Sequence, residues 1–559
     1  MVTTLLEALV RAADTDRGYV FVRDTGTTRT QRYAELLQVV LRIGGSLAAM
    51  GLHPGDLVAI VAPDAETFLP AFLGVAAAGL VPAPVFPPSY LGQDASYQEV
   101  TGTIVRASRA NAILTTASLK PVIGGLDLRG MPPVIYAEEL SGPTLPAPIR
   151  VDYRQPAIVQ FTSGSTSEPK GVVLSHHNLA ANVVAIGAAL RLNEREVTVS
   201  WLPLYHDMGL IGMALVPIYF GMKAVFMSPQ MFIKRPVEWL KGIQSHGGTV
   251  SFAPNFGYDL VVRRVRDLDL IGLDLSSWRV AGCGSEPIQA ETLITFAERF
   301  EASGFRASSF VPSYGMAEHA LAVTFTPLDR PPVVDVVSGA DLTQRQRAVP
   351  CGADDPGGAR LVSCGVAFPG HEVRIADDHG RPMPERRVGE VLLRGPSVMQ
   401  GYFDQPELNE ETLRGGWLHS GDLGYLANGE LYVCGRKKET IIVNGRNYYP
   451  QDLEWAVGGI DGIRRGRVVA FGTSAPGRGD SVVVVAETNG ESAEPLEPQI
   501  RRRILDLFGL YVDDVVVARG GTIAKTTSGK LKRGLARARY EAGEFAERPQ
   551  LGPKESLAD

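Results

Sequence analysis

The sequence predicts an α/β protein with a large N-terminal domain of βαβ-built parallel sheets, a small β layer, and a small α+β domain at the C-terminus. Three observations predict this class. The chain of 559 residues is too long for one hydrophobic core, so two or more domains are expected. Between residues 155 and 325, short β-branched segments alternate with longer helical patterns, which is typical of βαβ units. Beyond residue 330 this alternation is replaced by shorter strand patterns.

The N-terminal part contains two segments that could be mistaken for targeting or membrane signals. Residues 1–18 carry charges where a signal peptide needs an uninterrupted apolar run, so an amphipathic helix is expected. Residues 67–93 carry no charge but are interrupted by prolines, and a buried helix running into a strand is expected there rather than a membrane span. These prolines are Pro70, Pro82, Pro84, Pro87 and Pro88. We therefore expect a cytoplasmic protein without stable membrane insertion.

The central region supplies the expected parallel sheet. Its buried strands are predicted at residues 157–161, 197–201, 223–227, 249–253, 278–282 and 308–312. Helices are predicted between them at 175–190, 236–247 and 287–304, the last with Pro287 in its first turn. Residues 30–115 repeat the same alternation less clearly.

The C-terminal third has a different texture. Residues 331–360 are rich in Pro, Gly, Asp and Arg, and their hydrophobic periodicity is poor. Three antiparallel strands are expected after them, at 371–377, 389–395 and 429–435. A compact α+β unit follows, with its boundary in CGRKKE at residues 434–439. The expected domains are therefore residues 1–435 and 436–559.

Composition excludes several function classes. The charged fraction is 21%, the net charge is −6, and Lys and Arg are scattered, so no surface for nucleic acid is expected. The four cysteines have no CxxC spacing, which favours free thiols in a reducing compartment over a disulfide framework or zinc site. They are Cys283, Cys351, Cys364 and Cys434.

The segment TSGSTSEPKG, residues 162–171, is the most informative motif. It lies between a predicted strand and the helix near Ser175, and combines a glycine, several hydroxyls and Lys170. Such a loop offers hydroxyl and backbone N–H donors plus a point charge, which indicates a phosphate cradle. It is not a Walker loop, because GxxxxGK[ST] is not satisfied. Taken alone, a solvated Ser/Thr-rich turn remains the alternative.

Further loops follow predicted strands at the same sheet edge. GCGSEP (282–287) is a glycine turn able to approach a planar ligand, and SYGMAE (313–318) adds an aromatic ring and a carboxylate. Ligands of open parallel sheets bind at the carboxyl ends of the strands. Glu318 is well placed for Mg²⁺, which takes one or two carboxylates plus substrate phosphates. In HSGDLG, Asp422 is expected in a tight turn, where it could accept from ribose hydroxyls.

In this order the motifs resemble the adenylate-forming superfamily of acyl-CoA synthetases, adenylation domains and luciferases. GRKKETIIVNG resembles its hinge motif and TTSGKLKR its C-terminal lysine motif, and the resemblance covers nearly the whole chain. It implies ATP and Mg²⁺ as cofactors, a mobile small domain, Lys438 at the hinge, and Arg436 at the ribose and hinge. Lys530 would stabilise the charge that develops on the carboxylate and α-phosphate. Cofactor binding would fall to Thr162, Ser163, Gly164, Ser165, Thr166, Lys170, Gly284, Ser285, Glu286, Tyr314, Gly315, Met316, Asp422 and Arg436.

A finer resemblance is to the fatty acyl-AMP ligase branch, carried by the strings at 201–212, 253–260, 273–288, 361–365 and 445–454. Ala317, where the superfamily usually has threonine, is normal in that branch. Such ligases pass the acyl group to the phosphopantetheine of an acyl carrier protein rather than to coenzyme A. They also carry an extra segment that restricts the small domain, and residues 337–362 are the candidate here, with an ordinary surface loop as the alternative.

Two further features admit more than one interpretation. The resemblance places His206 beside an acyl tunnel, where it would contact the substrate carboxylate, although a structural histidine is nearly as good an account. The apolar Met208, Ile211, Met213 and Leu215 that follow could line that tunnel, but core packing is the default for such a stripe.

Particular residues argue against other functions. An acyl-CoA synthetase is the nearest rival, and a non-catalytic nucleotide-binding module would be expected to have lost Lys530 or Glu318. SHHNLAAN lacks the HHxxxDG of condensing acyltransferases, and no GxSxG elbow exists. The sequence around Ser481 runs straight into a buried strand, so it is no phosphopantetheine site and any carrier protein must act in trans. The resulting expectation is an ATP- and Mg²⁺-dependent fatty acyl-AMP ligase.

Overall fold

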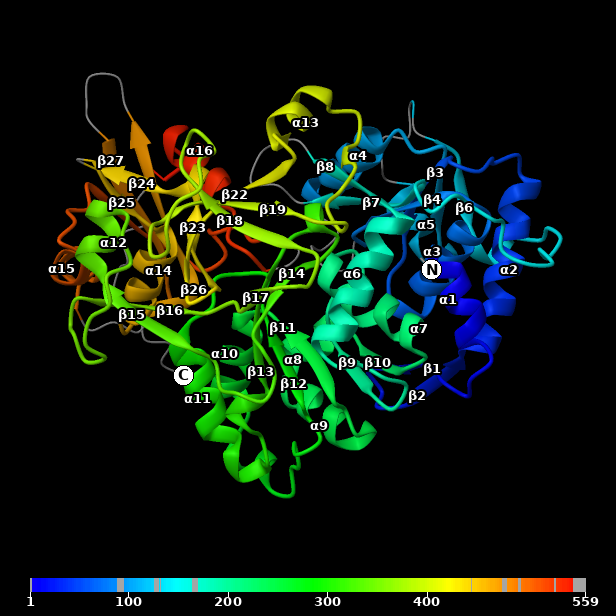
Figure 1. Cartoon of the computed structure of the whole chain (residues 1–559), viewed down its shortest axis with the longest axis horizontal. Coiled ribbons are helices and arrows are strands. Elements are labelled where there is room, and N and C mark those ends of the chain that lie inside the picture. Colours follow the sequence, from blue (N-terminus) through cyan, green and yellow to red (C-terminus); the bar gives the residue numbers. More distant parts are fainter. Residues whose placement is uncertain are drawn as a thin grey trace, which may run out of the picture.

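A nine-stranded sheet occupies the centre of the large domain (Figure 1), in the order β17-β14-β13-β12-β11-β9-β10-β1-β2. Its strands from β13 to β1 run parallel, as the alternating pattern predicts, and antiparallel strands flank them. In this computed structural model, residues 3–87, 95–124, 130, 132–162, 169–443, 445–474, 480–490, 494–526 and 529–545 are described. The sheet's strands are β1 (Gly18–Val22), β2 (Thr28–Arg32), β9 (Val197–Ser200), β10 (Lys223–Met227), β11 (Val250–Ala253), β12 (Val280–Cys283), β13 (Phe310–Gly315), β14 (Ala322–Phe325) and β17 (Val366–Ala367).

A second, fully parallel sheet is formed by the N-terminal region, in the order β4-β3-β5-β6. The charge-free segment gives a buried helix followed by β4, as predicted, but Pro70 lies inside that helix rather than ending it. The elements of this region are α1 (Leu5–Ala12), α2 (Tyr33–Ala49), β3 (Leu57–Val61), α3 (Ala65–Ala77), β4 (Val81–Val85), α4 (Ala95–Ser108), β5 (Ala112–Thr115), α5 (Lys120–Ile123) and β6 (Val134–Tyr136). No helix among the described residues is long and apolar enough to cross a membrane.

The strand predicted at 157–161 does not join the parallel sheet. It forms β7 (Pro156–Thr162), which pairs antiparallel with β8 (Lys170–Ser175), and β20 (Gly401–Tyr402) completes this three-stranded sheet. The connection from β7 to β8 is only seven residues, whereas a parallel pair needs a crossover of a dozen or more. The short loop therefore forces the antiparallel arrangement.

Helices cover the central sheet close to where the pattern places them. They are α6 (His176–Ala189), the π-helical η4 (Met208–Leu215), α7 (Val216–Phe220), α8 (Pro229–Lys234), α9 (Val237–His246), α10 (Asn255–Arg264) and α11 (Ala290–Phe300). Pro287 is not in the first turn of α11, contrary to the prediction, because the helix begins only after Gln289. The Gln289 N–H donates to Asn255 Oδ1 at 3.0 Å, which holds the segment before the helix extended.

The small β layer contains the three predicted antiparallel strands, one longer strand and one short strand. It is formed by β18 (Glu372–Ala376), β19 (Gly389–Arg394), β21 (Leu413–Arg414), β22 (Trp417–Ala427) and β23 (Glu430–Arg436), with α13 (Pro406–Thr412) beside it. Asp422 is on β22, opposite Arg436 of β23, and not in a tight turn as expected. Gly421 has a φ of +70°, so the backbone bends inside the strand. The sequence HSGD indicates this bend, but it does not indicate that β22 continues and pairs with β23.

The 337–362 segment is ordered by secondary structure that its poor periodicity did not predict. Strands β15 (Val334–Ser338) and β16 (Gly358–Val362) pair as an antiparallel ribbon. Helix α12 (Gly339–Arg345) lies between them along the chain and contacts β25 of the small domain (Figure 1). Leu342 is buried in one cluster with Tyr425 and Cys434 of the β layer and with Tyr449 of the small domain. The short strand and helix each hide only one or two side chains, too few to give a period.

Beyond Arg436 the chain forms two small sheets with helices packed on them, as predicted for an α+β unit. One sheet is β24-β25 and the other β26-β27-β28, and their hydrophobic clusters are separate from the main cluster of the large domain. The elements are β24 (Ile441–Val443), β25 (Arg446–Tyr448), α14 (Pro450–Gly458), β26 (Ile463–Ser474), β27 (Asp480–Thr488), α15 (Leu496–Phe508), β28 (Asp514–Ala518) and α16 (Arg533–Glu541).

Candidate active site

The neck of the predicted phosphate loop is held by an antiparallel pair. Thr162 at the end of β7 lies opposite Lys170 at the start of β8. Residues 163–168 of the loop between them, including the predicted Ser163, Gly164, Ser165 and Thr166, lie outside the described residues. Their proposed role rests on the motif.

Lys170, Glu318 and Tyr402 form one group beside that neck. The Tyr402 hydroxyl donates to Glu318 Oε1 at 2.8 Å, and Lys170 Nζ lies 5.2 Å from the centre of the Tyr402 ring. Burial and the positive charge of Lys438 lower the pKa of Lys170, while Glu318 opposes the shift. The predicted metal carboxylate and phosphate lysine are thus near neighbours.

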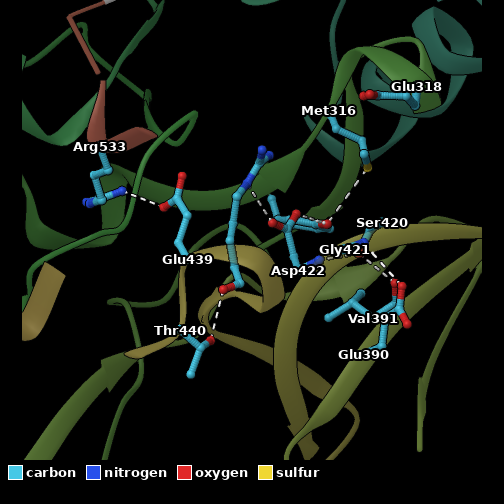
Figure 2. A network of polar contacts seen from close by, with 12 residues as sticks. Met316, Glu318, Glu390, Val391, Ser420, Gly421, Asp422, Glu439, Thr440 and Arg533 are labelled. Carbon is cyan, nitrogen blue, oxygen red and sulfur yellow. Dashed lines mark hydrogen bonds and ion pairs between the residues drawn. The ribbon is translucent and has the colours of Figure 1, made fainter. Parts of the chain in front are cut away.

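Asp422 connects two of the predicted nucleotide residues (Figure 2). It accepts a hydrogen bond from the Tyr314 hydroxyl at 2.7 Å, and its Oδ1 lies 3.0 Å from Arg436 Nε. Asp422 is buried, and its charge raises the pKa of Arg436. An ionised carboxylate has about four acceptor positions, so Asp422 retains capacity for two ribose hydroxyls.

The two predicted glycines of the nucleotide loops are positions of close backbone approach. A Cβ on Gly284 would lie 2.6 Å from Ser313 Oγ, and one on Gly315 would lie 2.0 Å from the Leu321 carbonyl oxygen. Glycine is required at both positions because no side chain fits.

Ser285, Glu286 and Met316 stand on the loops that these glycines turn, and all three line the same cavity. Ser285 has a φ of +71°, and Glu286 Oε1 accepts from the Phe256 N–H at 2.6 Å. The Tyr314 hydroxyl also lies 3.9 Å from Met316 Sδ (Figure 2). The loops thus lie against α10 on one side and β22 on the other.

Lys530 reaches this site from the small domain. It lies in a turn in which the Thr526 N–H donates to the Lys530 carbonyl at 2.7 Å, and it lines the same cavity as Glu286 and Asp422. A Cβ on the neighbouring Gly529 would lie 3.2 Å from the Phe256 ring, so the turn rests directly on the large domain. Desolvation by the surrounding protein, and then the positive charge of Arg436, lower the pKa of Lys530. The carboxylates of Asp207, Glu286 and Asp422 oppose this shift.

His206 and Asp207 lie at the start of η4, within the electrostatic reach of Lys530. Burial first, and then Lys530, lower the pKa of His206 to about 3, so its ring is neutral at physiological pH. Asp207 Oδ1 accepts from the Met208 N–H at 2.7 Å, and burial raises the pKa of this carboxyl. A neutral imidazole can still donate one hydrogen bond to a carboxylate.

A cavity of about 2140 Å³ is lined by His206, Glu286, Glu318, Asp422 and Lys530, and it continues past them along an apolar wall. Ile211, Met213 and Leu215 do not line it and are almost fully buried, so core packing is their role. Met208 does line it, together with Gly209 and Gly212 of the same helix. Only one member of the apolar stripe therefore faces the predicted acyl tunnel.

The hinge motif lies in the 3₁₀ turn η9 (Lys437–Glu439), directly after β23. Lys437 Nζ lies 2.7 Å from Asp378 of the large domain, and Glu439 is paired with Arg533 of the small domain at 2.6 Å (Figure 2). Lys438 therefore lies between two anchored neighbours, one on each side.

Sequence reasoning missed Tyr402 and Phe256. Tyr402 fixes Glu318 although it belongs to another sheet and to no recognised motif, and no sequence signal points to it. Phe256 lies in the APNFGYDL string that the sequence singles out, but only the structure brings it against Glu286 and the Lys530 turn.

Comparison with known proteins agrees with this geometry. The family model of the AMP-binding enzymes matches residues 9–403, and that of the Disco-interacting protein 2-like AMP domain matches 438–550. A Caulobacter vibrioides protein named as an acyl-CoA synthetase is 35% identical, with 97% of this chain and 96% of that protein covered.

Two further similarities concern fatty acid ligases. A Teredinibacter turnerae protein, named medium-chain-fatty-acid–[acyl-carrier-protein] ligase TtuA, is 32% identical, with 93% of this chain and 90% of that protein covered. A solved structure from a study of fatty acyl-adenylate ligases from E. coli and L. pneumophila is 36% identical, with a TM-score of 0.92 over 98% of this chain and 99% of that one. This chain belongs to the AMP-binding enzymes of the adenylate-forming superfamily, in the fatty acyl-AMP ligase branch.

Proposed function

We propose that the protein is a cytoplasmic enzyme that activates a fatty acid with Mg²⁺–ATP as acyl-AMP and then transfers the acyl group to the phosphopantetheine of an acyl carrier protein in trans. One observation carries the adenylation step. Lys530 of the small domain shares one cavity with the Glu286 loop, Asp422 and the apolar wall. A cation, a nucleotide site and an acyl site are thereby adjacent.

The residues divide the adenylation reaction between them. The substrate carboxylate attacks the α-phosphate, an acyl–phosphate bond forms, and pyrophosphate leaves. Asp422 would hold the ribose, and Lys170 with the preceding loop would hold the departing phosphates. Lys530 would stabilise the negative charge between the carboxylate and the α-phosphate, while neutral His206 would donate to the carboxylate.

Magnesium fits the donor set at Glu318. The described residues contain no group of three or more His, Cys, Asp or Glu that could hold a metal by themselves. Mg²⁺ commonly binds through one or two carboxylates plus substrate phosphates, and Glu318 lies beside the phosphate lysine. The ion would neutralise phosphate charge when it is bound there.

Glu318→Gln is expected to weaken the binding of Mg²⁺–ATP and to lower adenylation by about 10²-fold, because the variant keeps the shape but loses the charge. Adenylation is measured across a Mg²⁺ titration. Glu410→Gln, the same change at an exposed position on α13, is the control and should match wild type. An unchanged apparent Mg²⁺ affinity in Glu318→Gln would remove Glu318 from the metal site.

Two observations support an acyl carrier protein as the acceptor of the acyl group: the contacts of the 337–362 segment and the name of a relative. Helix α12 contacts the small domain, and Leu342 and Tyr449 share one buried cluster, so domain rotation would have to break these contacts. TtuA is named a ligase of a fatty acid and acyl carrier protein. The alternative acceptor is coenzyme A, as in the similar Caulobacter vibrioides protein's name.

One experiment tests both steps. The protein is incubated with ATP, Mg²⁺ and a panel of fatty acids, acyl-AMP is measured by mass spectrometry, and CoA or a holo acyl carrier protein is then added. We expect acyl-AMP with pyrophosphate, and acyl transfer to the carrier protein only. Absence of acyl-AMP with every acid would refute the adenylation, and abundant acyl-CoA would make the enzyme a CoA ligase.

A further inference from the structure

Thr198 places a hydrogen-bonding hydroxyl in the apolar part of the cavity. The residue lies on β9, is 1% exposed, and lines the cavity together with Ile186, Leu190, Leu192 and Val250. Within the part of the chain that the structure describes, Thr198 Oγ1 has no hydrogen-bond partner. Buried hydroxyls are normally paired, because leaving one unpaired costs stability.

The direction of this side chain follows from the alternation along β9. Val199 faces α9, since a Cβ on Gly248 of the following loop would lie 2.7 Å from Val199 Cγ2. Successive side chains of a strand point to opposite faces, so Thr198 faces the side covered by η4. Thr198 pairs in register with Val250, which lines the cavity beside it.

Thr198 is also remote from the reacting groups. It is the second residue of β9, whereas His206, Asp207 and the nucleotide loops follow the carboxyl ends of their strands. A substrate whose carboxylate lies at that edge would extend along the strand toward its amino end. In such a substrate, Thr198 would lie near the end of the acyl group that is farthest from the carboxylate.

We propose that Thr198 recognises an oxygen on the distal part of the acyl chain, so that the preferred substrate is a hydroxylated acid rather than a plain fatty acid. This inference rests on the proposed adenylation. A threonine hydroxyl both donates and accepts, so it suits a hydroxyl of the substrate. The surrounding aliphatic side chains would exclude water from this contact.

The test compares matched acids on matched variants. Linear acids of several lengths, each with and without a terminal hydroxyl, are assayed with wild type, Thr198→Val and Thr115→Val. Thr115 is a second buried threonine with an unpartnered hydroxyl, but it lies on β5 and does not line the cavity. For each enzyme, kcat/KM for acyl-AMP formation is measured for both members of every pair.

We expect wild type to prefer one hydroxylated acid over its unsubstituted partner. Thr198→Val should lower that preference about tenfold, the effect of one neutral hydrogen bond, while Thr115→Val leaves it unchanged. Valine keeps the threonine shape, so the Tm of Thr198→Val should equal or exceed that of wild type.

Three results would contradict a role of Thr198 in substrate recognition. An equal change in both acids, an unchanged preference, or a lower Tm would assign Thr198 to structure or to a bound water and overturn the inference. Failure of wild type to adenylate any acid would instead refute the proposed function, so the two failures are distinguishable.

Discussion

Lys530→Ala is expected to lower acyl-AMP formation by about 10²–10³-fold, the loss seen when one preorganised donor is removed from a developing charge. Lys530 is one of the cations of the small domain that line the cavity with Glu286 and Asp422, and it is the one that the lysine motif singles out. Folding should be intact, because the side chain is exposed to the cavity and adds no apolar core. Lys532→Ala, in the same loop, is the control and should retain most activity.

The same residue predicts a pH dependence. The pKa of Lys530 is lowered by its crowded surroundings and by Arg436, so its charge is lost at a lower pH than for an ordinary lysine. The adenylation rate of wild type should therefore fall on the alkaline side, as pH rises through this lowered pKa. In Lys530→Arg that limb should move to higher pH, because arginine stays protonated and only the titration of Lys170, whose pKa is also lowered, remains. Near-wild-type adenylation by Lys530→Ala would refute the assignment.

The carboxyl edge of the parallel sheet could be predicted from the sequence because each loop there follows a recognisable buried strand. Gly284, Tyr314, Gly315 and Glu318 come directly after or at the end of such strands. The last three line the cavity, and Gly284 precedes Ser285, which also lines it. The position of Lys530 could not be predicted from its own surroundings. It depends on a contact between domains, Gly529 against Phe256, which leaves no periodic pattern.

Two of the incorrect predictions share a physical cause. β7 has the composition of a parallel strand, and only its short connection to β8 decides its direction. Asp422 follows a glycine in a turn-like string, but cross-strand pairing with Arg436 keeps the chain in a strand. In both places, long-range pairing overrides a local signal. That the Thr198 hydroxyl has no hydrogen-bond partner among the described residues could likewise be recognised only from the structure.

The 337–362 segment is anchored to the β layer through the start of β15 and contacts the small domain through α12. At the base of β15, Asp335 accepts from the Tyr425 hydroxyl at 2.7 Å and lies 2.9 Å from Arg386, both of the β layer. At the other end, Leu342 is buried in the cluster that includes Tyr449, and α12 contacts β25. The contacts of Leu342 with Tyr449 and of α12 with β25 exist only while the small domain keeps its present orientation, whereas those of Asp335 lie within the large domain. We propose that the contacts with the small domain bias the hinge toward the adenylating arrangement.

Replacing residues 340–360 by a short Gly/Ser bridge is expected to leave adenylation largely intact and to raise acyl-CoA formation by up to about 100-fold. A bias of about 2.7 kcal/mol suffices to hold the rotated, thioester-forming state near one per cent, and removing it would release that state. A carrier protein can offset such a bias through its own surface contacts, whereas free CoA is small and has fewer ways to do so. Acyl-CoA is measured by mass spectrometry for wild type and deletion.

Leu342→Ala supplies a graded version of the same test. It removes a buried side chain from the contact without shortening the chain, a change that typically costs about 2–5 kcal/mol in a packed core. Part of that cost falls on the adenylating arrangement, so acyl-CoA formation should rise by less than in the deletion. Arg345→Ala, at an exposed position on α12, should not raise it. If the folded, adenylating deletion makes no more acyl-CoA than wild type, the segment is not the barrier, and the acceptor must be selected by the small domain itself.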